Sequence, residues 1–253
     1  MRKFCTLLKY EVHKLLVSPS TYFIAAIFLA TLAFAYLFTL REFVLSDQSF
    51  TFMHAFLRQS WVSPLLAIPL LTMRTFSEDY KMGLMQSIKT TAAGDFSIVG
   101  AKFLATYLFY AALWASSLLL VFLPVLPIPT ILRDGSFLAI CNLIGGYSYI
   151  LLAGLFFTAM GIFFSSLTEN QILSGILSFV AIFATFLSGP IFSSHTLSSD
   201  TFLDRAFIRP LNIFHQMDNA CWGVFDTRII ILYTTLSVLF LAFTKVSLEK
   251  KFN

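Results

Sequence analysis

The sequence predicts an all-α integral membrane protein. Hydrophobic residues make up 58% of its 253 residues, and charged residues only 12%. Soluble domains carry about 25% charged residues. A single globular core could not also enclose the thirty phenylalanines present. Lipid must therefore solvate much of the surface, and the apolar runs approach the twenty or so residues that a membrane helix requires.

The first 18 residues predict an amphipathic helix. Apolar residues recur at steps of three and four, with charged residues largely between them. Such a helix lies in the membrane interface, where its lysines suit anionic head groups. Ser18-Pro19-Ser20 then ends it, and Ser20 or Thr21 can cap the helix that follows.

Six apolar segments are predicted to span the membrane. They cover about residues 21–40, 61–76, 98–123, 136–164, 172–192 and 228–244. The second contains Pro64 and Pro69, so a bent helix is expected there. The fourth carries Gly145, Gly146, Gly154 and Gly161, which allow neighbouring helices to approach closely and predict a central position.

Two polar intervals separate these spans. Residues 77–97 are charged and helix-like, which predicts a helical hairpin on one side of the membrane. Residues 193–227 mix charges with apolar anchors, which predicts short interfacial or re-entrant helices on the opposite side.

The distribution of basic residues predicts that both termini are cytoplasmic. With the termini inside, eleven basic residues lie on the inner side: Arg2, Lys3, Lys9, Lys14, Arg74, Lys81, Lys89, Lys102, Lys245, Lys250 and Lys251. Six lie outside: Arg41, Arg58, Arg133, Arg205, Arg209 and Arg228. Cytoplasmic loops are enriched in Lys and Arg, so the interval 77–97 is also predicted to be cytoplasmic.

The sequence contains no recognisable catalytic or metal-binding motif. It has no G-x-x-x-x-G-K-[ST], H-E-x-x-H or G-x-S-x-G, and its four histidines and three cysteines are scattered. Transporters coupled to ions bury ionisable residues at mid-membrane. Arg74 and Lys102 instead fall near the cytoplasmic ends of their spans, and Glu169 falls in a loop. We therefore expect no enzymatic activity, no metal and no nucleic-acid partner in this chain, and energy supplied by another protein rather than an ion gradient.

The segment from Leu71 to Leu104 resembles ABC-2-type permease subunits of ATP-binding-cassette transporters. In that family a coupling segment of the form F-[AS]-E-E-K-R-S-G-T-x-E-L-L-L-T-S-P-V-S-D-W-x-I-V-x-G-K-F joins the second and third spans. The matching positions are Phe76, Glu78, Asp79, Lys81, Gly83, Thr90, Asp95, Phe96, Ile98, Val99, Lys102 and Phe103. The departures are Met82, Leu84, Gln86 and Ala92.

The C-terminal part is also similar to this family, in particular to its gliding-motility and copper-enzyme-maturation permeases. The similar stretches are Arg209–His215, Gly223–Arg228 and Ser247-Leu248-Glu249. With six predicted spans and the amphipathic start, the resemblance covers essentially the whole chain as one transmembrane domain.

The resemblance implies a permease subunit of a bacterial inner-membrane exporter. Two copies of a separate ATPase, which bind the ATP and magnesium, would dock on a dimer of permeases, either identical or related. The implied ATPase-coupling residues are Glu78, Asp79, Lys81, Gly83, Gln86, Thr90 and Asp95.

Several alternatives stay open. The interval 77–97 can be a solvated loop whose charges only set the topology. In the external region the candidate residues are Asn212, His215, Asp226 and Arg228. For Asp226 and Arg228 we prefer a local role, capping and anchoring the sixth span, over substrate binding. The alternative function is a mechanotransmitting subunit, which relays ATP hydrolysis to an external assembly without moving cargo.

Overall fold

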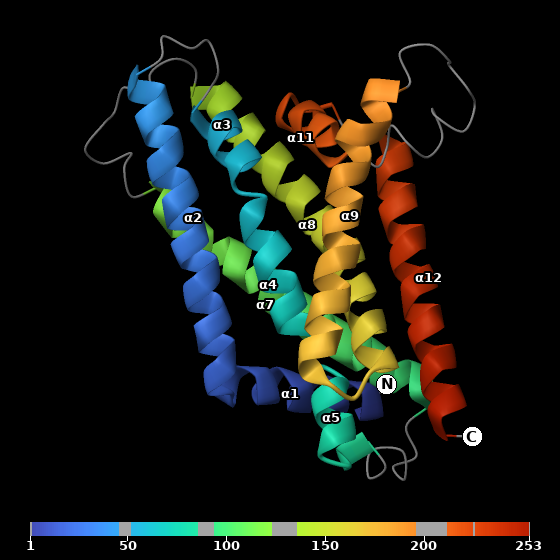
Figure 1. Cartoon of the computed structure of the whole chain (residues 1–253). Coiled ribbons are helices and arrows are strands. Elements are labelled where there is room, and N and C mark those ends of the chain that lie inside the picture. The colour runs from blue at the N-terminus through green and yellow to red at the C-terminus, as the bar shows by residue number, and fades with distance from the viewer. Residues whose placement is uncertain are drawn as a thin grey trace.

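The fold is a bundle of long helices closed at one end by a helix lying across it (Figure 1). The computed structural model describes residues 2–45, 52–85, 94–122, 136–195, 212–224 and 226–252, and every regular element within them is a helix. The helices are α1 (Arg2–Val17), α2 (Pro19–Leu45), α3 (Phe52–Gln59), α4 (Val62–Thr72), α5 (Ser77–Lys81), α7 (Asp95–Phe122), α8 (Ser136–Leu167), α9 (Gln171–His195), α11 (Ile213–Cys221) and α12 (Thr227–Phe252).

Five of these helices are long and apolar enough to cross a membrane. The candidate spans are Pro19–Glu42, Asp95–Leu119, Asn142–Leu167, Gln171–Gly189 and Thr227–Lys251. They confirm the prediction of an all-helical, multi-pass membrane protein. They also correspond to five of the six predicted spans.

The remaining predicted span, residues 61–76, is not one bent helix. Only Val62–Thr72 is continuous there as α4, and eleven residues rise about 16 Å, too short for a bilayer core of about 30 Å. A turn at Ser60 and Trp61 separates α4 from α3, and the two short helices lie end to end (Figure 1). Pro64 stands in the first turn of α4, where its missing N–H is not needed, so it begins a helix instead of bending one.

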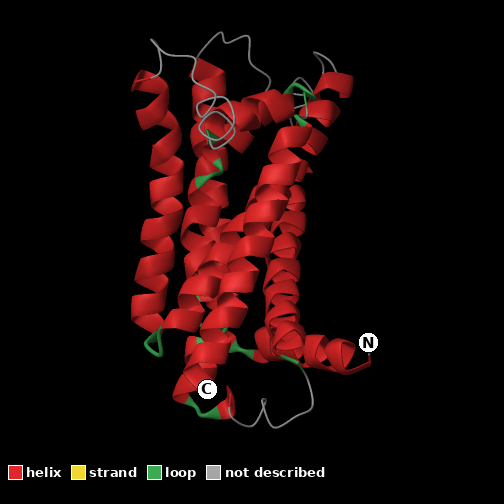
Figure 2. Cartoon of the chain, turned by 90° about the vertical axis from the view of Figure 1, so that its right-hand side faces the viewer, coloured by secondary structure: helices red, strands yellow, loops and turns green. Residues whose placement is uncertain are grey.

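Helix α1 lies across the lower end of the bundle, and α2 rises from its end (Figure 1). The chain turns at Ser18, as predicted, and Pro19 opens α2. Both termini lie at this end (Figures 1 and 2). We call it the base of the bundle.

Helix α8 occupies the centre, as its glycines predict. Its membrane window is 67% buried, against 22% to 44% for the other four. A Cβ atom at Gly145 would collide with the carbonyl oxygen of Ala220 in α11, one at Gly154 with the Tyr110 ring of α7, and one at Gly161 with Thr72 of α4. Three different helices therefore reach the α8 backbone where it lacks side chains.

Candidate functional site

The most strongly organised polar site is an ion cluster at the base, built around Lys102. This lysine lies two turns into α7, and its side chain is 1% exposed. Its ammonium group donates to Glu11 Oε1 at 2.8 Å, to the Thr75 carbonyl at 2.9 Å and to Asp79 Oδ2. A buried lysine remains charged only with such partners.

Asp79 extends the cluster to a second lysine. Its other carboxylate oxygen, Oδ1, accepts from Lys14 Nζ at 2.6 Å. Glu11 and Lys14 lie three residues apart and so share one face of α1. The cluster therefore ties α1, α5 and α7 together through two ammonium groups and two carboxylates.

The electrostatics of Asp79 show which effect dominates in the cluster. Burial of its carboxyl group alone would raise the pKa. The charges and hydrogen bonds of Lys102 and Lys14 outweigh burial and hold the pKa of Asp79 below its ordinary value of 3.8. Asp79 is therefore a carboxylate at physiological pH.

A serine of α8 anchors the other side of α5. The backbone N–H groups of Phe76 and Ser77 donate to Ser165 Oγ at 3.1 and 3.3 Å, and Ser165 donates to the Met73 carbonyl at 3.2 Å. Helix α5 has no side-chain cap of its own at Phe76. Ser165 thus satisfies N–H groups that a helix start leaves unpaired, and it couples α5 to the central helix.

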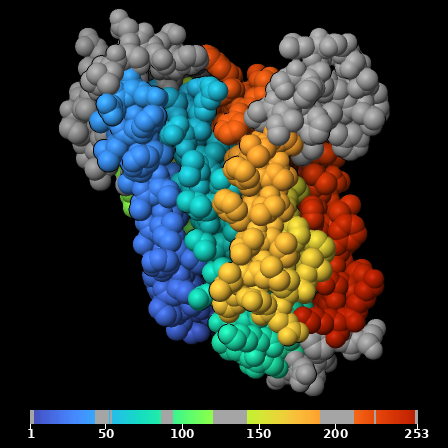
Figure 3. All heavy atoms as spheres, viewed as in Figure 1, coloured from blue at the N-terminus to red at the C-terminus, as the bar shows by residue number. Residues whose placement is uncertain are grey.

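Beyond these anchors, the end of α5 is exposed at the base (Figure 3). Lys81, Met82 and Leu84 are exposed, and Gly83 makes the turn between them with a φ of +69°. A cavity of about 400 Å³ lies between Lys81 and the turn that joins α8 to α9, lined there by Glu169, Asn170, Gln171 and Ile172. We call these exposed residues and this cavity the base surface.

The C-terminus of α12 borders the base surface. Lys251 pairs with Glu169 at 3.0 Å and places its ammonium 3.9 Å from the centre of the Tyr80 ring. Burial, followed by the charges of Asp79 and Glu169, raises the pKa of Tyr80 to about 12. The Tyr80 phenol is therefore neutral beside this ion pair.

The structure separates the predicted coupling residues into different environments. Lys81 and Gly83 belong to the base surface, and Glu78 is partly buried beside a cavity described below. Asp95 is partly exposed in the first turn of α7. Gln86 and Thr90 lie outside the described residues.

Asp79 requires a correction, because we expected it to offer a contact to a partner. It is 1% exposed, and both of its carboxylate oxygens are paired within the chain. Sequence reasoning also missed Glu11, Lys14 and Ser165. Of these three residues, only Glu11 could have been singled out from the sequence, since it is the single acidic residue among the first 18.

The predicted external residues serve the ends of two helices. Asn212 Oδ1 accepts from the backbone N–H of His215 at 3.3 Å and caps α11. The exposed His215 places its Nδ1 3.2 Å from the Asn219 amide nitrogen. Asp226 Oδ1 accepts from the backbone N–H of Arg228 at 2.9 Å and caps α12. The rest of that interval, residues 196–211, lies outside the described part of the chain.

Among the described residues there is no group of three or more His, Cys, Asp or Glu side chains that could hold a metal ion. Comparison with known proteins found no matching family model, no similar curated protein and no similar solved structure.

Proposed function

We propose that this protein is the permease subunit of an ATP-binding-cassette exporter, driven by a separate ATPase that docks on the base surface. The proposal rests on the resemblance of the segment between Leu71 and Leu104 to the coupling region of ABC-2-type permeases. The structural observation that best supports it is the anchoring of α5, whose buried part is joined by polar contacts to α1, α7 and α8 while its C-terminal end is exposed.

These anchors would make α5 an effective point of force transfer. The contacts of Asp79 to Lys14 and Lys102 join it to α1 and α7, and Ser165 joins it to α8. A partner that displaces α5 must therefore move these helices with it or break buried polar contacts. This explains how hydrolysis in a separate subunit could rearrange the spans.

The docking contact would use the residues that α5 leaves exposed. Lys81 offers a charge-assisted hydrogen bond. Met82, 61% exposed, and Leu84 offer an adaptable apolar anchor. The cavity beside Ile172 would receive a side chain of the partner.

The proposed assembly follows from the resemblance to ABC-2-type permeases. The base faces the cytoplasm of a bacterium, where the ATPase binds ATP and magnesium. A second permease, identical or related, completes the transmembrane pathway. In this proposal ATP hydrolysis belongs to the separate ATPase.

Co-purification with the ATPase tests the proposal. We expect Lys81→Glu combined with Met82→Asp to reduce recovery of the ATPase about tenfold or more, because each removes one docking contact. Both residues are exposed, so the fold should be preserved. Trp222→Asp combined with Val224→Asp is the matched control, since these side chains are 69% and 62% exposed near the opposite end.

Two results would contradict the proposal. One is ATPase recovery that is equal for the two double variants. The other is transport by the purified chain alone, driven by an ion gradient. If the ATPase docks at the base and is stimulated but no cargo crosses the bilayer, the mechanotransmitting alternative is favoured.

A further inference from the structure

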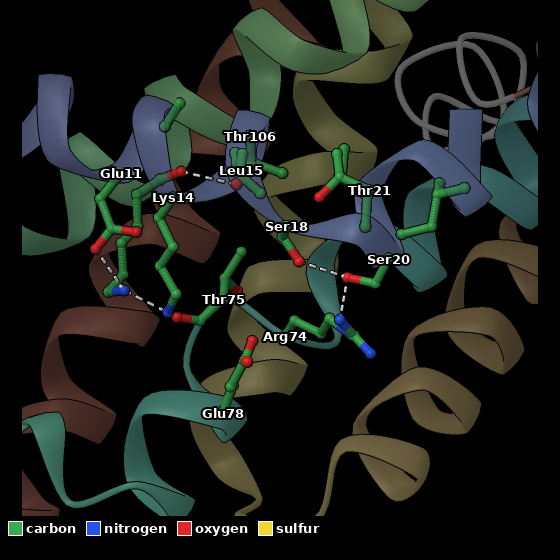
Figure 4. A pocket seen from close by; sticks show the side chains of 14 residues that line it. Glu11, Lys14, Leu15, Ser18, Ser20, Thr21, Arg74, Thr75, Glu78 and Thr106 are labelled. Atoms are coloured by element: carbon green, nitrogen blue, oxygen red, sulfur yellow. Dashed lines mark hydrogen bonds and ion pairs between the residues drawn. The ribbon is translucent and has the colours of Figure 1, made fainter. Parts of the chain in front are cut away.

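A polar cavity of about 140 Å³ lies at the base, where α1 meets α2, α4 and α7. Its polar wall comprises Glu11, Lys14, Ser18, Ser20, Arg74 and Glu78. Figure 4 shows Arg74 and Glu78 directed toward this space, with Arg74 reaching Ser20. The cavity adjoins the ion cluster, because Glu11, Lys14 and Lys102 also line it.

Pairing within the cluster leaves one positive and one negative group for the cavity. Lys14 and Lys102 are neutralised by Asp79 and Glu11. The guanidinium of Arg74 is hydrogen-bonded to the neutral Ser20 hydroxyl, and its buried Nε has no hydrogen-bond partner within the described part of the chain. The carboxylate of Glu78 has no ion pair or hydrogen bond within the described part of the chain, although the residue is partly buried; only its backbone carbonyl is used, by the Met82 N–H.

The two halves of the cavity favour opposite charges. On one side, Arg74 and the Ser18 and Ser20 hydroxyls stand at the N-terminus of α2, whose dipole favours an anion. On the other side, the unpaired carboxylate of Glu78 favours a cation. A ligand that carries a phosphate next to an ammonium group would match both.

The position of the cavity fits a membrane lipid. Ser18 separates the helix across the base from the first span, and Arg74 lies two residues beyond the end of α4. These residues therefore lie at head-group depth. Leu15, Ile24 and Leu71 form the apolar part of the wall, and the last two belong to helices that continue into the bundle.

We propose that this cavity binds the zwitterionic head group of an aminophospholipid such as phosphatidylethanolamine. The phosphate is held by Arg74, Ser18 and Ser20, and the ammonium by Glu78. Phosphatidylglycerol supplies only the phosphate. Phosphatidylcholine supplies a cation that cannot donate hydrogen bonds to the carboxylate. The inference does not depend on the proposed ATPase, and its test requires none.

The experiment measures lipid retained by the full chain. The protein is reconstituted in nanodiscs of equal parts phosphatidylethanolamine, phosphatidylglycerol and phosphatidylcholine, extracted in mild detergent, and its bound lipid counted by mass spectrometry. We expect phosphatidylethanolamine to be enriched about tenfold, the effect of one charge-assisted hydrogen bond. Arg74→Gln should lower the retention of all three phospholipids, because each carries the phosphate that Arg74 would hold.

Glu78→Gln is the more specific variant. It should retain phospholipid but lose the preference for phosphatidylethanolamine over phosphatidylglycerol. Arg58→Gln and Glu249→Gln are the matched controls, because both residues are exposed outside the cavity and should retain the full preference. Thermal unfolding in the same detergent identifies any variant that fails to fold, and for such a variant Arg74→Met or Glu78→Ala, which also remove the charge, is used instead.

Three results would overturn the proposal. The first is equal retention of the three lipids by the unmodified protein. The second is an unchanged preference in a folded Glu78 variant. The third is displacement of the bound lipid by soluble phosphoethanolamine at an affinity equal to that of the lipid, which would identify a free amino phosphate as the ligand.

Discussion

Replacing Lys102 by methionine is expected to lower the free energy of unfolding by about 3 kcal/mol. Removing one partner of a buried ion pair costs about 3 to 5 kcal/mol, because the other charge stays buried without compensation. The lower end applies here. Asp79 keeps Lys14 at 2.6 Å, and the Glu11 side chain, 10% exposed, can recover some hydration. Methionine keeps most of the apolar stem but removes the ammonium, which lies 5.3 Å from the centre of the Phe76 ring.

A second substitution separates charge imbalance from lost packing. Lys102→Met combined with Glu11→Leu leaves one carboxylate, Asp79, facing one ammonium, Lys14. Since no unpaired charge remains in the cluster, we expect the double variant to lose less stability than the sum of the two single losses, by about 1.5 kcal/mol, a typical coupling energy for contacting residues.

The assay is reversible unfolding in mixed micelles, with the denaturing detergent titrated. Lys245→Met is the control, because that lysine is 43% exposed and its pair with Glu249 should contribute less than about 1 kcal/mol. Our reasoning is refuted if Lys102→Met is no more destabilising than Lys245→Met. It is also refuted if the losses of Lys102→Met and Glu11→Leu simply add.

Two further predictions concern the anchoring of α5. Ser165→Ala should cost about 1 to 3 kcal/mol and speed amide exchange at Phe76 and Ser77, because their N–H groups lose their acceptor. Ser166→Ala is the control, since that hydroxyl donates to the Phe163 carbonyl of its own helix; equal effects of the two variants would contradict the assignment. Because the pKa of Asp79 is lowered in the folded state, its carboxylate contributes its full stabilisation at pH values well above 3.8. This contribution is lost as the pH falls below 3.8 through the folded pKa. The stability of Asp79→Asn should therefore fall less steeply in that acid range than the stability of the unmodified protein. Parallel acid-unfolding profiles for the two proteins would argue against the buried ion pairs.

The structure differs most clearly from the sequence-based predictions at residues whose type is compatible with two structural roles. Pro64 could bend a span or begin a helix, and only the turn at Ser60 and Trp61 decided in favour of a new helix. Asp79 stands between Glu78 and Lys81 in a charged interval, so a solvated position was the natural expectation. Its partner Lys14 lies 65 residues away, and no local pattern reports such a pairing.

The sequence by itself determined the class, the first helix and its end at Ser18, and the central position of α8. The low content of charged residues indicates the membrane class, and apolar residues at steps of three and four indicate the first helix. The glycines of α8 indicate its central position, because they let neighbouring helices approach closely. Only the tertiary structure decided which charges are buried together. Glu11, Asp79 and Lys102 are far apart in the chain, and a buried charge is tolerated only where distant elements converge to pair it. The packing of these elements also places Arg74 and Glu78 at the same cavity. The sequence does not indicate that this cavity exists.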